Sequence, residues 1–142
     1  MKKFVLLPVA LLVFGACASM HHGPSATATL GSTSGSQAAG TVMLNEMADG
    51  SVEVVVHLTG VPAGVHGFHI HEKGDCGDNG NAAGGHYNPT GTPHGAPSAD
   101  AHHAGDFGNV TADANGVVDT RFTTRSITVT AGPNSAVGHA II

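Results

Sequence analysis

Histidine is the residue type that stands out in this sequence, because 11 of its 142 residues are histidine. A single residue, Ile70, separates His69 from His71, and all three lie within residues 67–72, where the pattern predicts a β-strand. Alternate residues of a strand lie on one face, so the two imidazoles would start from Cα atoms about 7 Å apart, with Ile70 pointing into apolar packing. Two imidazoles side by side suit a transition metal such as copper or zinc.

A second group of metal-binding residue types lies in and just after residues 73–105, a long segment without periodicity. The group consists of His86, His94, His103 and Asp106. Three imidazoles and one carboxylate complete a tetrahedral zinc shell with no open position, which is typical of a structural site. Zinc would order a segment that has no apolar core of its own. The alternative is a loosely structured, histidine-rich segment that takes up metal without a defined site.

The rest of the chain is predicted to be all-β. Valine and leucine alternate with more polar residues over residues 52–59, and the turn residues 48–51 join this strand to one around residues 41–44. Further strands are expected near residues 27–30 and over residues 67–72, 107–112, 117–123, 127–130 and 137–142. No segment shows a helical apolar stripe, so the expected fold is a β-sandwich or barrel.

Composition excludes several classes of protein. Only 11% of the residues are charged, Gly occurs 21 times, and the formal net charge is −5. This composition is unlike that of a coiled coil, a helical bundle or an acidic tail. The five basic residues form no patch, so we expect no nucleic-acid partner.

The N-terminal residues are typical of an export signal. Lys2 and Lys3 precede an apolar run over residues 4–16 that is short for a membrane span. Phe14-Gly15-Ala16-Cys17 resembles the lipobox of bacterial lipoproteins, whereas Ala16-Cys17-Ala18 also fits ordinary secretion. We favour lipidation of Cys17. The expected organisation is a signal peptide (1–16), a flexible tether (17–36) and one β domain (37–142) in an exported, periplasmic protein that meets the membrane only through its lipid anchor. Removal of Lys2 and Lys3 with the signal takes the formal charge from −5 to −7.

Several motifs together resemble the Cu/Zn superoxide dismutase family. They are Gly67-Phe68-His69-Ile70-His71-Glu72, Gly74-Asp75-Cys76, Gly84-Gly85-His86-Tyr87-Asn88-Pro89, His94-Gly95 and His103-Ala104-Gly105-Asp106. The intervals of 2, 15, 8, 9 and 3 residues between successive candidate ligands match the family pattern. The resemblance covers about residues 27–142 and implies a Greek-key β-barrel or sandwich.

The resemblance also implies a function and a role for each residue. The implied enzyme converts its substrate superoxide to oxygen and hydrogen peroxide, with copper and zinc as cofactors. The catalytic copper ligands would be His69, His71 and His86, and the zinc ligands would be His86, His94, His103 and Asp106. His86 would bridge the two metals as an imidazolate.

For four other histidines, His57, His66, His102 and His139, we expect no role as metal ligands. His66 resembles a family histidine that hydrogen-bonds loop backbone and is not a ligand. His57 is expected on the outer face of its strand and His102 in solvent. His139 stands where many members have arginine, and we assign it no role.

The resemblance stops where the sequence stops, at Ile142. In the family, Cys76 would form a disulfide, and a fourth copper-ligating histidine, an arginine beside copper, the disulfide partner and the last strand would follow. We therefore expect a fragment of a longer protein, with a barrel that lacks its last strand, and we do not expect Arg121 or Arg125 to replace the arginine. A homodimer is left open, because dimer surfaces vary in the family. The alternative function is a non-catalytic periplasmic zinc- or copper-binding protein.

Overall fold

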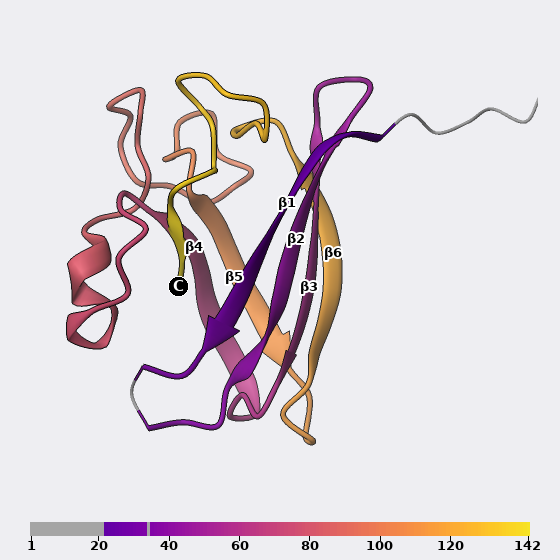
Figure 1. Cartoon of the computed structure of the whole chain (residues 1–142), viewed down its shortest axis with the longest axis vertical. Coiled ribbons are helices and arrows are strands. Elements are labelled where there is room, and N and C mark those ends of the chain that lie inside the picture. Colours follow the sequence, from indigo (N-terminus) through magenta and orange to yellow (C-terminus); the bar gives the residue numbers. More distant parts are fainter. Residues whose placement is uncertain (1–21, 34) are drawn as a thin grey trace, which may run out of the picture.

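The computed structural model describes residues 22–33 and 35–142, so the expected signal peptide and Cys17 lie outside it. Two antiparallel sheets face each other (Figure 1). The four-stranded sheet has the order β1-β2-β3-β6, formed by His22–Gly31, Ala39–Met47, Val52–Thr59 and Val118–Thr124. The three-stranded sheet has the order β5-β4-β7, formed by Asp106–Ala112, Gly64–His71 and Ala140–Ile141. The all-β prediction is confirmed as a sandwich, and the sheets do not close into a barrel.

Strand β3 shows how the sequence builds the four-stranded sheet. Its burial alternates strictly, with Val54 and Val56 fully buried, while His57 points to solvent as expected. The turn before it is held by Asp49, whose carboxylate accepts hydrogen bonds from the backbone N–H and the hydroxyl of Ser51. This turn sets the register of the β2–β3 hairpin, in which Val42 pairs with Val56.

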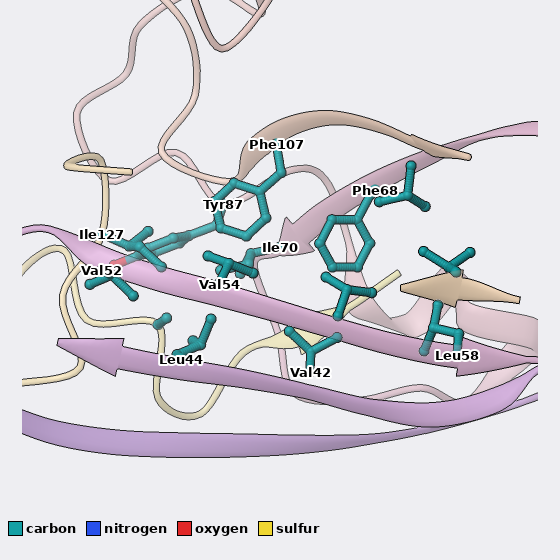
Figure 2. Packing of buried hydrophobic residues seen from close by; sticks show 14 of the residues in the cluster. Val42, Leu44, Val52, Val54, Leu58, Phe68, Ile70, Tyr87, Phe107 and Ile127 are labelled. Carbon is teal, nitrogen blue, oxygen red and sulfur yellow. The ribbon is translucent and has the colours of Figure 1, made fainter. Parts of the chain in front are cut away.

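The core lies between the two sheets (Figure 2). Val42 and Val54 of the four-stranded sheet face it from one side, and Phe68 and Phe107 of the other sheet face it from the opposite side. The rings of Phe68 and Phe107 have centroids 5.9 Å apart. Burial of Phe68 and Ile70 fixes which face of β4 points inward, so His69, the residue between them, points outward.

Three expected elements differ from the structure. Residues 127–130 form no strand but only an isolated bridge, Thr128 to Ser135. The reason is that the Glu46 carboxylate accepts the N–H groups of Val129 and Thr130, which a neighbouring strand would otherwise pair. The expected strand over residues 137–142 is reduced to Ala140–Ile141. A short 3₁₀ helix, η1 (Asp78–Ala83), lies in the segment expected to be irregular.

The N-terminal part of the sandwich begins earlier than expected. Strand β1 covers His22–Gly31 and pairs with β2 from Met47 to Ala39, so residues 22–31 of the expected tether belong to the sheet. Most of β1 is exposed, and an exposed edge strand needs no alternation of apolar residues. Its early residues, Gly23, Pro24 and Ser25, therefore carry no strand signal.

The sandwich is open along one side. Among the described residues, β1 pairs only with β2, and β7 pairs only with β4. Between these two edges lies a groove of about 410 Å³, the β1–β7 groove, whose lining includes Ala28, Leu30, Cys76, His139, Ile141 and Ile142. Within residues 22–33 and 35–142, no helix has the length and apolar character needed to cross a membrane.

Candidate metal centre

The candidate site begins with the outward face of β4. Because Ile70 is buried, its neighbours His69 and His71 both point away from the core, and their ring centroids lie 6.4 Å apart. Nδ1 of His71 donates a hydrogen bond to the carbonyl oxygen of Gly84 at 2.9 Å. A carbonyl can only accept, so the proton of the neutral His71 ring is on Nδ1 and its Nε2 is free to bind a metal.

Backbone hydrogen bonds attach the long loop to this strand. The N–H of Tyr87 donates to the carbonyl of Ile70 (2.8 Å), and the N–H of Ile70 donates to the carbonyl of Gly105 (3.0 Å). The N–H of Gly105 in turn reaches the carbonyl of Tyr87 (2.9 Å). A Cβ on Gly105 would lie 2.2 Å from the Ile70 oxygen, so only glycine allows this close approach. The result is that His86 and Asp106 lie beside β4.

His86 is the residue between two groups of donor atoms. Its ring stacks on that of His69, with centroids 4.0 Å apart and planes inclined by 22°. Its centroid is 5.2 Å from those of both His71 and His94. Two groups have mutually close ligand atoms, all within 4.8 Å: one is His69, His71 and His86, and the other is His86, His94, His103 and Asp106. All six expected ligands are thus brought together, and His86 belongs to both groups.

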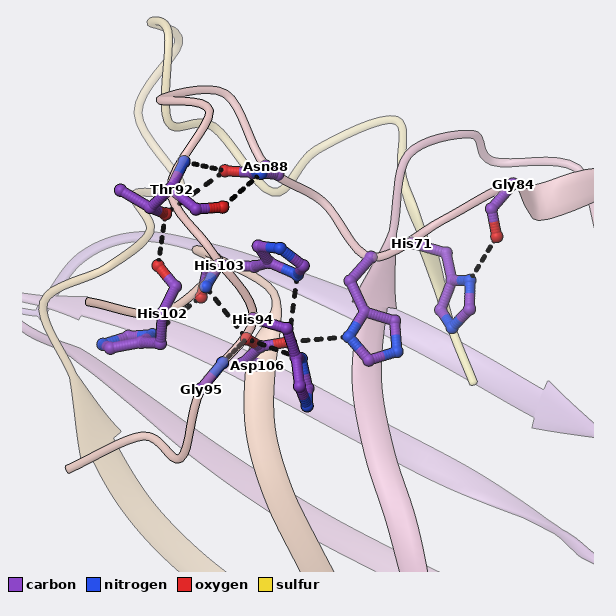
Figure 3. A network of polar contacts seen from close by, with 10 residues as sticks. His71, Gly84, Asn88, Thr92, His94, Gly95, His102, His103 and Asp106 are labelled. Atoms are coloured by element: carbon purple, nitrogen blue, oxygen red, sulfur yellow. Dashed lines mark hydrogen bonds and ion pairs between the residues drawn. The ribbon is translucent and has the colours of Figure 1, made fainter. Parts of the chain in front are cut away.

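Asp106 is the hydrogen-bonding centre of the second group (Figure 3). Its carboxylate, 2% exposed as a residue, accepts from Nδ1 of His86 at 2.6 Å and of His94 at 3.0 Å. The backbone N–H groups of Gly95 and His103 donate to its other oxygen at 3.1 and 2.9 Å. Burial alone would raise the pKa of Asp106, but the His86 and backbone hydrogen bonds outweigh it and hold that pKa well below its usual range. Asp106 is therefore an anion at neutral pH.

Two observations show that this second group fits a cation. Nδ1 of His103 is buried and has no hydrogen-bond partner among the described residues, although it lies 3.4 Å from Asp106. Such a buried nitrogen is costly unless something satisfies it. Three imidazoles with one carboxylate form a donor set that zinc binds tetrahedrally. A zinc ion would supply the missing partner of His103.

The first group, His69, His71 and His86, carries no carboxylate. Partial burial, together with the neighbouring His86, lowers the pKa of His69. A lowered pKa keeps the His69 ring neutral, which is the form that binds a metal. Three neutral imidazoles suit copper as well as zinc.

The two arginines lie at the other sheet, with Arg121 on β6 and Arg125 directly after its last residue. Arg125 donates to the backbone oxygen of Asp49 at 2.8 Å and to its carboxylate, and Arg121 lies 3.7 Å from the Glu53 carboxylate. Both side chains are thus engaged on the four-stranded sheet. These contacts agree with the expectation that neither takes the place of the family's arginine.

The remaining histidines have structural contacts. Nε2 of His66 donates to the Pro62 carbonyl at 2.6 Å, as the resemblance implies. His102 is half-buried rather than solvated, and its Nδ1 donates to the carbonyl of His103 at 2.7 Å. His139, for which the sequence predicts no role, has its ring centroid 4.0 Å from that of Tyr87, and its Nδ1 donates to the Glu72 carbonyl at 2.8 Å. Residues 72 and 139 are far apart in sequence, so no local pattern could indicate this contact. Cys76 is free and exposed.

Comparison with known proteins agrees with this geometry. The family model of copper/zinc superoxide dismutase matches residues 38–142. The chain belongs to the copper/zinc superoxide dismutase family. A solved structure, the crystal structure of the clock protein EA4, is similar to the chain with a TM-score of 0.74 and 36% sequence identity. The similarity covers 87% of this chain and 78% of that one. The family resemblance of the sequence motifs is confirmed, and so is the Greek-key type of sandwich that it implied.

Proposed function

We propose that this chain is a superoxide dismutase, with copper at His69, His71 and His86 and zinc at His86, His94, His103 and Asp106. The observation that carries the proposal is that one residue, His86, belongs to both groups of donor atoms. An imidazole has two nitrogens on opposite sides of its ring, so a single side chain can serve both metals. Asp106 accepts a hydrogen bond from Nδ1 of His86. This leaves Nε2 of His86 for the copper group, which consists of His69, His71 and His86; the other group, His86, His94, His103 and Asp106, is the zinc group.

Each residue contributes to the reaction in a defined way. Bound copper supplies the redox chemistry, because it can alternate between two oxidation states. His69 and His71 would hold copper through ring nitrogens on the outward face of β4, and His86 would hold and release a proton at Nε2. Two superoxide ions and two protons give one oxygen and one hydrogen peroxide, so a residue that delivers protons at the site is needed. Asp106 and the other residues of the zinc group, His94 and His103, keep the His86 ring in place.

A second candidate function is metal binding without catalysis. It is favoured by the donor count, since the zinc group has four protein ligands among the described residues and the copper group has three. Both arginines of the described part of the chain are paired with carboxylates away from the site. Both candidates predict bound zinc, so zinc content does not separate them.

The rate of superoxide consumption does separate them. The full chain, loaded with copper and zinc and freed of unbound copper by gel filtration, is expected to consume superoxide far faster than the zinc-only protein. His69→Ala is expected to reduce the rate to that of the zinc-only protein. His57→Ala is the matched control, because His57 is exposed on the outer face of β3 and should leave the rate unchanged. A fully loaded chain without activity would support the metal-binding candidate.

We further propose that the protein is exported and anchored by a lipid on Cys17. The support is the Lys2-Lys3 start, the apolar run and the lipobox-like Phe14-Gly15-Ala16-Cys17. In a bacterial host supplied with labelled palmitate, the chain should take up the label and sediment with membranes. Cys17→Ser should abolish both, and Cys76→Ser should not. Equal labelling of the wild type and Cys17→Ser would contradict the anchor.

A further inference from the structure

Gly67, two residues before His69 on β4, occupies a position where its backbone gives no reason for glycine. Its φ is not among the positive values, so any residue could adopt its conformation. It is also exposed, so no core packing excludes a side chain. Glycine in the interior of a strand weakens that strand, which makes its presence here a cost that needs an explanation.

The irregularity of the β4–β5 ladder does not explain the glycine. Gly67 pairs with Asn109 and His69 with Asp106, so the extra residue of this bulge lies on β5. The positive φ of +81° at the bulge belongs to Gly108, which is also on β5. The backbone of β4 runs through the irregularity without needing a glycine.

The space above Gly67 gives the explanation. A Cβ at this position would meet the imidazole of His69, at 2.9 Å from Cε1, 3.5 Å from Nδ1 and 4.0 Å from Nε2. These are its three nearest neighbours, so the ring alone fills the space a side chain would need. Residues i and i+2 of a strand share a face, and the ring of His69 leans along the strand toward residue 67.

The position of the His69 ring matters because one face of the ring already packs against another imidazole. It stacks on His86 with a centroid distance of 4.0 Å. A methyl group at position 67 would push the ring away from its present place by a few tenths of an ångström or turn it. Either change alters the direction of the His69 nitrogens relative to His71 and His86, which are the other members of the copper group.

We propose that Gly67 is a positioning residue, whose missing side chain creates the space that places the His69 imidazole for metal binding. The placement of the His69 ring by Gly67 depends on the geometry of the chain alone, whereas its effect on copper rests on the proposed function.

A double-mutant cycle on the metal-free full chain tests the first statement. Gly67→Ala, His69→Ala and the double variant are compared with the wild type by thermal unfolding. With the ring removed, alanine should raise the midpoint, because it suits a strand better than glycine. With the ring present, the contact should cancel this gain or reverse it. The control is Gly132→Ala, whose Cβ has no atom within 4 Å and whose φ is not positive. It should shift the midpoint equally with and without His69. An equal shift from Gly67→Ala in both backgrounds overturns the proposal.

Copper binding tests the second statement. The Cu(II) absorption and electron paramagnetic resonance spectra of Gly67→Ala should differ from those of the wild type, with copper affinity lower by about tenfold, as for other residues that orient a ligand. Zinc affinity should not change, since His69 is outside the zinc group. An unchanged copper spectrum overturns the positioning role. A shifted spectrum with a wild-type chain that lacks dismutase activity would retain this role while contradicting the proposed function.

Discussion

Asp106 combines burial with a full set of hydrogen-bond donors, and this combination defines its role. Two imidazole nitrogens and two backbone N–H groups point at one carboxylate. A buried carboxylate that accepts so many bonds stays ionised, and it holds the surrounding rings in place before any metal arrives. The zinc group is therefore preorganised around a negative charge.

Asp106→Asn should weaken zinc binding strongly. The amide has the shape of the carboxylate but no charge, and its NH₂ group would face a donor, Nδ1–H of His86 or the N–H of Gly95. We expect zinc affinity to fall by at least about 100-fold, since even residues that only orient a ligand contribute 10- to 100-fold. Competition with a chromogenic chelator measures the affinity. Asp119→Asn, at an exposed site beside His57, is the control. Similar affinities in both variants would show that Asp106 is not a ligand.

The six candidate ligands were predictable at the level of single residues because their types and intervals can be read directly from the sequence. The roles of Gly67, His102 and His139 were not. Each depends on an atom that folding brings near: a ring of the same strand leaning back, a carbonyl turned toward a ring, or a carbonyl 67 residues away. A sequence shows which side chains can bind a metal, but it does not show where space is left empty for them.

Glu46, near the end of β2, connects the sheet to a distant loop. One carboxylate oxygen accepts from the backbone N–H groups of Val129 (2.8 Å) and Thr130 (2.7 Å), and the other accepts from the Thr130 hydroxyl (3.1 Å). The backbone hydrogen bond from Thr130 is the main cause that lowers the pKa of Glu46 below its usual value of 4.5. The carboxylate thus replaces a partner strand for residues 129–130.

This lowered pKa predicts a pH-dependent contribution to stability. The unfolded chain binds the Glu46 proton more tightly than the folded chain, so the stabilisation is complete above about pH 4.5 and is lost as the pH falls through the folded pKa. Glu46→Gln should lower the melting temperature near neutral pH, and the difference from the wild type should shrink as the pH falls below 4.5. Thermal unfolding across this range provides the measurement. A constant difference at all pH values would mean that the charge of Glu46 does not matter.

At the level of elements, alternation predicted burial more reliably than pairing. Residues 52–59 alternate and form β3, with strand neighbours on both sides. Residues 127–130 also alternate, and Ile127 and Val129 are indeed buried, but a carboxylate and a turn take up their backbone hydrogen bonds. Edge strand β1 shows the converse at its start, because His22 and Ser25 pair with β2 without an alternation of apolar residues, whereas Ala26 and Leu30 farther along pack against the core. Partners that lie far away in sequence decide whether an extended segment becomes a strand.

At the scale of the whole molecule, the segment between β4 and β5 is held by few structural elements. Apart from η1 and the isolated bridge of His71 to His86, residues 72–105 have no regular secondary structure. Three zinc-group residues, His86, His94 and His103, lie in this segment, whereas Asp106 begins β5. A cation bound by all four would therefore tie the segment to the sheet at several points.

Zinc should consequently stabilise the whole domain. A ligand that binds only the folded state at about 1,000 times its dissociation constant contributes ~4 kcal/mol, which for a domain of this size raises the melting temperature by on the order of 10 °C. We expect this rise on adding zinc to chelator-treated protein, together with slower amide hydrogen exchange across residues 72–105. His94→Ala should lose most of the rise, because it removes one of the four ligands, and His57→Ala should retain it. A rise of equal size in both variants would place the stabilising ion elsewhere, and the segment would then depend on its backbone contacts with β4 alone.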